Sequence, residues 1–146
     1  MDPADYRFRS TERERFSLHD CRAKRAERTG ERLTFFFPDG IWCRDRGEDW
    51  PNTGPAAVTF SLDRLGETTV YLFEQTAAGD LRRELPLAEL LERINTGAWE
   101  LEFGYRYDRY REVLVTGWVW QDREPWSREC QLFLPTREPT EYWWNE

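Results

Sequence analysis

The residues of this sequence best suited to chemistry stand in one short segment, where the only histidine, His19, precedes Asp20 and Cys21. A cysteine thiolate beside a histidine base is a pairing that nucleophilic enzymes use. In an extended strand, however, His19 and Cys21 share one face while Asp20 points to the other, so Asp20 would not orient the imidazole. We therefore expect His19 and Asp20 to be structural residues, hydrogen-bonded at a strand start or bend, and we assign no catalytic residue.

The sequence contains no local motif for binding a metal or a cofactor either. The cysteines, Cys21, Cys43 and Cys130, are an odd set with wide gaps, so the sequence encodes neither a zinc site nor a disulfide framework. A metal site built from His19 and these thiols would need tertiary convergence. The chain also has no glycine-rich phosphate loop at the required spacing. We expect no metal and no cofactor.

Two glutamates, Glu100 and Glu102, lie two positions apart in a segment that alternates apolar and polar residues. In a strand they share a face at a separation of about 6.5–7 Å, a spacing that paired glycosidase carboxylates also use. Their face is the polar side of the strand, where Arg106 is available to pair with it. Ion pairing is therefore the favoured interpretation, and hydrolase activity is the third of three functional hypotheses.

Aromatic residues are the most distinctive feature of the composition, with eight tryptophans among 23 aromatic side chains. Five of the tryptophans fall in or near expected loops and ends: Trp42, Trp50, Trp126, Trp143 and Trp144. Exposed aromatic rings stack on sugars or anchor protein partners. The alternative is that they fold back and seal the end of the domain. Four of them are candidate binding residues, namely Trp50, Trp126, Trp143 and Trp144.

These residues must be positioned by strands, and turn signals predict two hairpins. Leu33–Phe37 and Ile41–Cys43 flank the turn sequence at 38–40, where proline presets the backbone and Asp-Gly supplies the turn. Ala57–Leu62 and Thr69–Glu74 predict a second hairpin across a turn at 63–67.

Other segments complete an antiparallel pattern. Further strands are expected at Tyr6–Arg9, at Arg15–Ala26 along an edge or bend, at Tyr110–Gln121, at Cys130–Leu134 and at Glu141–Trp144, and residues 45–55 are expected to form a long loop. A strand beginning at Trp99 alternates strictly, with Phe103, Tyr105 and Tyr107 on the core face and Arg106 and Asp108 in water.

One amphipathic helix is expected over about residues 86–96. Pro86 opens it, Gly97 ends it, and leucine or isoleucine recurs at 87, 90, 91 and 94, which places an apolar stripe on the sheet. With about nine or ten strands and this helix, residues 1–146 predict a single mainly β domain, either an antiparallel barrel or a sandwich.

The charge balance of the chain limits the classes of partner that it is expected to bind. The net charge is −7, and residues 47–146 hold 10 basic and 19 acidic side chains. This balance disfavours nucleic acid and anionic membranes, which are themselves negative. The first residues lack the pattern of a secretory signal, and no apolar run reaches the roughly 20 residues that span a bilayer. We expect a cytoplasmic protein.

The segment Phe16–Cys21, followed by Leu33–Gly40, resembles a leucine-histidine-aspartate pattern in small uncharacterised bacterial β-rich proteins, some of which are described as immunity proteins of polymorphic toxin systems. The resemblance covers about the first third of the chain and implies a structural motif and an interaction role. The leading hypothesis is therefore a non-enzymatic protein-interaction module with a basic partner. The alternative is a barrel or sandwich that binds a small ligand or carbohydrate.

Overall fold

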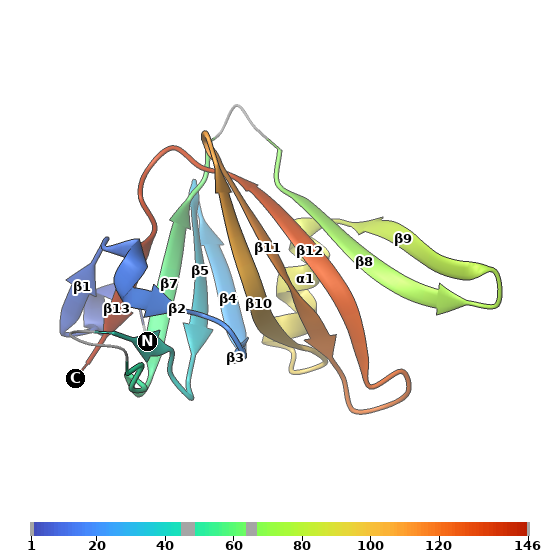
Figure 1. Cartoon of the computed structure of the whole chain (residues 1–146), viewed down its shortest axis with the longest axis horizontal. Coiled ribbons are helices and arrows are strands. Elements are labelled where there is room, and N and C mark those ends of the chain that lie inside the picture. Colours follow the sequence, from blue (N-terminus) through green and yellow to red (C-terminus); the bar gives the residue numbers. More distant parts are fainter. Residues whose placement is uncertain (1, 45–48, 64–66, 146) are drawn as a thin grey trace.

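The computed structural model describes residues 2–44, 49–63 and 67–145, so parts of the expected loop at 45–55 and of the expected turn at 63–67 lie outside the described residues. The described chain is mainly β with one α-helix, as predicted (Figure 1). Its strands are β1 (Phe8–Ser10), β2 (Phe16–Ser17), β3 (Cys21–Ala23), β4 (Arg25–Thr29), β5 (Arg32–Phe37), β6 (Trp42–Cys43), β7 (Ala56–Ser61), β8 (Thr69–Thr76), β9 (Gly79–Leu85), β10 (Glu100–Arg109), β11 (Glu112–Trp120), β12 (Ser127–Pro135) and β13 (Glu141–Trp144).

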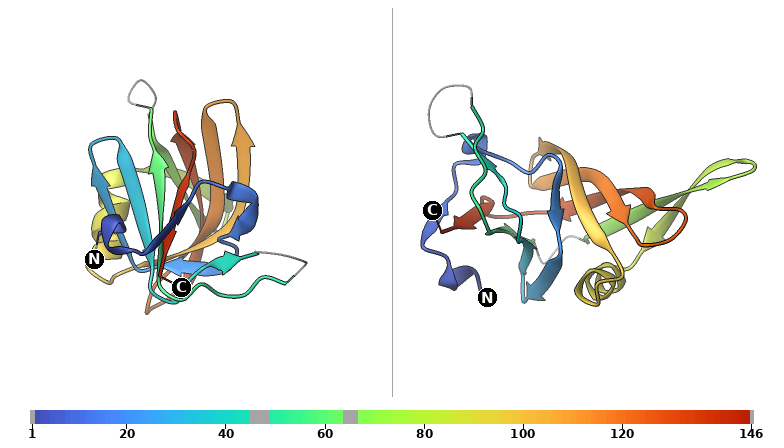
Figure 2. Two further views of the ribbon diagram at one scale, coloured as in Figure 1. Left: turned by 90° about the vertical axis from the view of Figure 1, so that its left-hand side faces the viewer. Right: turned by 90° about the horizontal axis from the view of Figure 1, so that it is seen from below.

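The strands form two antiparallel sheets and a small ribbon. The first sheet has the order β1-β13-β7-β5-β4, the second has the order β3-β10-β11-β12-β8-β9, and β2 pairs with β6. The sheets face one another as two layers, and the β8–β9 hairpin extends from one side (Figures 1 and 2). Of the two predicted architectures, the sandwich fits, because the described strands do not close into a barrel.

Phenylalanine rings join the two layers. The ring of Phe103 in the second sheet meets Phe35 and Phe37 of the first edge-on, with centroid distances of 5.1 and 5.3 Å. Edge-to-face pairs at such distances add to the free energy gained from burying the rings. The run of aromatic residues in β5 thus fixes how the second sheet sits on the first.

Both predicted hairpins are wrong. The turn after β5 forms, with Gly40 at a φ of 87°, but β6 leaves the sheet and pairs with β2. Both edges of β5 are occupied by β4 and β7. Likewise, β7 and β8 lie in different sheets. The turn signal at 38–40 marked where the chain reverses, whereas burial of Leu33–Phe37 on both faces decided that β5 is a central strand.

The predicted helix is present as α1 (Leu87–Asn95), with Leu90 and Ile94 buried. It lies beside β4 (Figure 1), and its last residue closes the edge of that strand. The Asn95 amide donates to the Ala26 carbonyl at 2.6 Å and accepts from the Ala26 N–H at 2.9 Å. Exposed edges invite pairing with other chains, so the side chain occupies a site where a further strand would bind. No helix in the described chain is long and apolar enough to span a membrane.

A β-bulge overturns the predicted alternation of β10. The register with β11 shifts between Phe103 and Arg106, so that Gly104 and Tyr105 together oppose a single residue. Beyond the shift, Arg106 pairs with the buried Val115, while Tyr105 and Tyr107 are 62% and 53% exposed. One extra residue exchanges the two faces of a strand. The tyrosines therefore lie in solvent and Arg106 points toward the core, the reverse of the expectation.

Replacing Asn95 by alanine removes both hydrogen bonds at the β4 edge. We expect Asn95→Ala to lower the free energy of unfolding by about 1–2 kcal/mol, measured by urea denaturation. Asn145→Ala is the matched control, because Asn145 accepts only one exposed hydrogen bond, from the Arg7 N–H, and should cost less than about 0.5 kcal/mol. Equal effects of the two variants would show that Asn95 does not secure this edge.

The bulge also depends on Gly117 of β11, where a Cβ atom would overlap the backbone carbonyl of Glu102. We expect Gly117→Ala to destabilise the fold by at least about 2 kcal/mol. Gly104→Ala should cost less, since its Cβ would sit 3.0 Å from the Thr116 carbonyl oxygen. Thermal unfolding of both variants gives the comparison, and a more harmful Gly104→Ala would contradict it.

Candidate functional site

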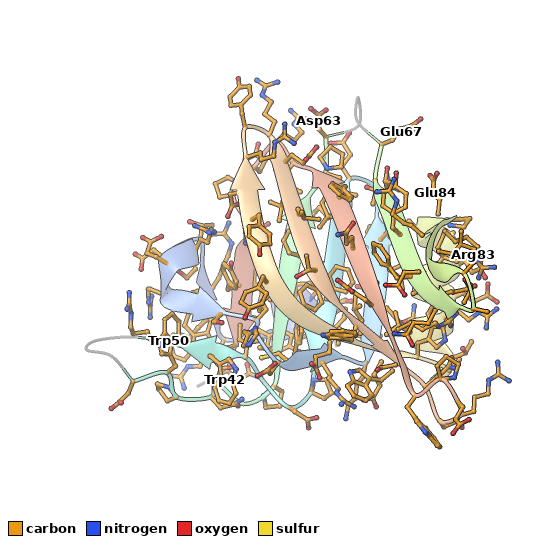
Figure 3. The ribbon with its side chains drawn as sticks, turned by 45° about the vertical axis from the view of Figure 1, so that its right-hand side comes forward. Trp42, Trp50, Asp63, Glu67, Arg83 and Glu84 are labelled. Atoms are coloured by element: carbon orange, nitrogen blue, oxygen red, sulfur yellow. The ribbon has the colours of Figure 1, made fainter. Side chains whose placement is uncertain are left out.

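A groove of about 900 Å³ opens between β10 and the segment 13–20. We call it the β10 groove. Its floor and inner walls are apolar, formed by Phe16, Leu18, Phe103, Val115 and Tyr142, and its rim carries Arg13, Glu14, His19, Asp20, Trp42, Trp50, Tyr105 and Arg106. Trp42 and Trp50 lie at the same end of the molecule (Figure 3). Most of the lining is aromatic or aliphatic, which is the usual character of binding sites.

The groove exists because β3 is short. It pairs with β10 only at Leu101, Glu102 and Phe103, and beyond this point no described strand pairs with that side of β10. The chain before β3 turns away at Asp20, whose φ is 64°, a left-handed conformation that aspartate adopts more readily than most residues. The Asp20 N–H still donates to the Phe103 carbonyl at 2.8 Å. The space left beside β10 is the groove.

His19 braces the rim of the groove. Its Nδ1 lies 3.1 Å from the Gly104 carbonyl oxygen, which only accepts, so Nδ1 carries the proton. Its ring packs against Tyr105 with centroids 4.9 Å apart, and its own carbonyl accepts from Trp42 Nε1 at 2.8 Å. The histidine thus links the bulge to β6. Nε2 lies 3.5 Å from the Asp20 carboxylate. Together, His19 and Asp20 hold the local backbone in place, and both residues also line the site.

Cys21 does not form a nucleophilic pair with His19. It is buried, and its Sγ lies 3.6 Å from the His19 backbone carbonyl oxygen. Burial is the main cause that raises the pKa of the Cys21 thiol to about 12, so it is protonated at neutral pH. Burial likewise raises the pKa of Cys130 to about 12. Nucleophilic cysteines need the opposite shift.

A polar network fixes the floor of the groove. Arg106 donates from Nη1 to the Tyr142 hydroxyl at 2.9 Å and from Nη2 to Asp108 at 3.0 Å. Arg13 meets the other carboxylate oxygen of Asp108 at 2.7 Å. Tyr142 stacks on Phe16 with centroids 4.3 Å apart, and its burial raises its pKa. Both rim arginines are thus held by one carboxylate.

The structure separates the predicted tryptophans. Trp50, together with Trp42, His19 and Asp20, lines the groove. Trp126 is 56% exposed near the start of β12, away from it. In β13, Trp143 donates to Thr59 at 3.2 Å, while the ring of Trp144 packs between Phe8 and Phe16.

Glu100 and Glu102 form ion pairs, as their polar face suggested, but not with Arg106. Arg22 of β3 bonds both, each at 3.2 Å, and its guanidinium lies 4.4 Å from the ring centre of Trp120. Lys24 Nζ lies 3.9 Å from Glu100, so Arg22 and Lys24 together offset the two carboxylate charges on the outer face. Because of the bulge, Arg106 points the other way.

Sequence reasoning missed several residues of the groove: Arg13, Phe16, Tyr105, Arg106 and Tyr142. Apart from the neighbours Tyr105 and Arg106 in β10, they come from separate strands and loops, so no local spacing joins them. One signal was present, because an isolated glycine inside an alternating strand, here Gly104, often marks a bulge.

Comparison with family models, curated proteins and solved structures finds no match to this chain. Within the described ranges, no group of three or more histidine, cysteine or acidic residues could hold a metal ion.

The raised thiol pKa values predict how stability changes in alkali. Above the ordinary thiol value of 9.0, Cys21 and Cys130 ionise in the unfolded chain but stay protonated in the folded one until pH about 12. Ionisation of the thiols therefore stabilises the unfolded state relative to the folded one. The free energy of unfolding should fall as pH rises through this interval. Urea denaturation at several pH values measures it, and a Cys21→Ala, Cys130→Ala double variant should lose part of the slope. A slope unchanged in the double variant would contradict the assignment.

Proposed function

We propose that this protein is a non-enzymatic interaction module that binds a protein partner through the β10 groove, and that its role is immunity-like. The observation that carries the proposal is the groove, whose floor is apolar and whose lining is mostly aromatic and aliphatic. Its floor is held by stacked Phe16 and Tyr142 and by the Arg106 network. A preformed site of this kind loses little conformational entropy on binding.

Aromatic residues outside the groove favour a protein over a small ligand. Tyr105 at the rim is followed on the same outer face by Tyr107, and Trp118 of β11 is 41% exposed on that face. Interfaces are enriched in tyrosine and tryptophan, which supply large contact areas at low entropic cost. Tyr105 lines the groove and also shares the outer face with these rings, so a protein that fills the groove has further aromatic side chains to contact nearby.

Charge supports a basic partner. Arg13 and Arg106 are already paired with Asp108, whereas Glu14 and Asp20 add negative charge to the rim. The whole chain carries −7. Such a surface accelerates encounter with a positive partner and weakens as salt rises. As part of this proposal the protein acts in the cytoplasm, a prediction that rests on its odd number of widely spaced cysteines.

A second candidate function is the binding of a small apolar or carbohydrate ligand. It is favoured by the groove volume of about 900 Å³, which falls within the range of ligand pockets, about 300–1,000 Å³. The aromatic rim would stack on a sugar or planar ring. Such a ligand would change tryptophan fluorescence through Trp42 and Trp50.

Affinity capture with groove variants tests the proposal. The tagged protein is used to capture partners from its host lysate at low and high salt, alongside Trp50→Ala and Tyr105→Ala. We expect a basic protein that is lost at high salt and reduced at least about tenfold by either variant, equivalent to about 1.4 kcal/mol. Circular dichroism checks that the variants fold.

Tyr110→Ala is the matched control, because Tyr110 is 87% exposed at the β10–β11 turn and does not line the groove. It should capture the partner as the wild type does. Retention of the same protein by both groove variants would show that binding occurs elsewhere. Empty captures together with a fluorescence response to small sugars or aromatic compounds would favour the second candidate.

A further inference from the structure

We infer that the partner is recognised by strand addition: an extended, basic segment pairs with the open edge of β10 at Arg106–Asp108 and inserts an apolar side chain into the β10 groove. This inference rests on the proposed function and specifies its mode of binding. Strand addition gives affinity through main-chain hydrogen bonds and specificity through pockets for alternate side chains. Both elements occur side by side at this edge.

At Arg106–Asp108 the backbone edge of β10 that faces away from β11 is not paired with any described strand. The Tyr105 N–H donates to Thr116 Oγ1 of β11 at 3.1 Å. Because N–H directions alternate along a strand, Tyr107 also points toward β11, whereas Arg106 and Asp108 point away from it. No described strand pairs with β10 on that side after Phe103. Two residues therefore present main-chain groups to an incoming segment.

His19 sets where the added strand would begin. Its ring bonds the Gly104 carbonyl, and the Asp20 N–H bonds that of Phe103, so these two carbonyl groups before Tyr105 are already satisfied. The open stretch starts immediately after this cap. It is bounded at its far end by the Arg13–Asp108 ion pair, whose atoms are 2.7 Å apart.

Two other sheet edges, those of β4 and β9, are less suitable. The β4 edge is closed by Asn95, as described above. The β9 edge is long but nearly fully exposed, with Asp80, Arg82, Arg83 and Glu84 along it. Charged side chains on an edge oppose pairing, and the β10 groove does not border β9. The β10 edge alone among these three adjoins the groove.

The surroundings define the chemistry of the segment. Side chains of an added strand alternate between the two faces of the second sheet. Those on the inner face would enter the groove above Phe16 and Tyr142, which favours an apolar residue. Those on the outer face would lie beside Tyr105 and Tyr107. Glu14 and Asp20 at the rim favour lysine or arginine on either side of the apolar residue.

Peptide selection followed by amide exchange tests the mode. Short random peptides displayed on phage are selected against the full chain, and a selected peptide whose binding is weakened by Trp50→Ala and Tyr105→Ala but not by Tyr110→Ala is synthesised. On binding this peptide, the Arg106 and Asp108 amides should exchange at least about tenfold more slowly. The Tyr107 amide, which already faces β11, is the internal control and should not change.

Versions of the peptide that are N-methylated at one residue each give an independent readout. Methylation at alternate positions should weaken binding at least about tenfold, because it removes donors that face β10, and methylation between them should be tolerated. A groove-dependent peptide that tolerates every methylation and leaves the Arg106 and Asp108 amides unchanged would overturn strand addition while leaving the proposed function intact. A selection that yields no groove-dependent peptide would overturn both.

Discussion

Two consecutive residues of β10, Gly104 and Tyr105, oppose one residue of β11, and the candidate site depends on this mismatch. The close approach of the strands requires Gly117, because any Cβ there would overlap the Glu102 carbonyl. After the bulge, side chains that would have faced solvent point between the sheets. Arg106 can then reach Tyr142, and Tyr105 can meet His19.

The inward arginine would be unfavourable without partners, since burying a charge costs free energy unless it is paired. Asp108 supplies the opposite charge, Tyr142 accepts a hydrogen bond, and the guanidinium lies 5.7 Å from the ring centre of Phe60. Because Arg106 and Tyr142 both line the β10 groove, the network that satisfies Arg106 also fixes part of the wall of the groove.

Local sequence patterns were sufficient to predict part of the fold. The period of leucines predicted α1, and the strands at Cys130–Leu134 and Glu141–Trp144 were found because their composition is typical of half-buried strands. Which strands pair with one another was harder to predict, because β5 pairs with β4 and β7 through contacts that no turn signal encodes. Of the predicted binding residues only Trp50 lines the groove, whereas His19 and Asp20, which also line it, were expected to be structural. Its remaining residues converge from distant strands, and one inserted residue reversed the expected face of Tyr105 and Arg106.

An open edge beside an apolar groove is a risk for any chain, because two copies could pair through it. The net charge of −7 opposes such pairing, since like-charged copies repel one another. The same charge attracts a basic segment to the rim at Glu14 and Asp20. One property of the sequence therefore does two things at this site: it disfavours self-association and favours the proposed class of partner. Arginine pairing within the fold does not cancel this effect, because each internal ion pair removes one charge of each sign and leaves the net charge unchanged.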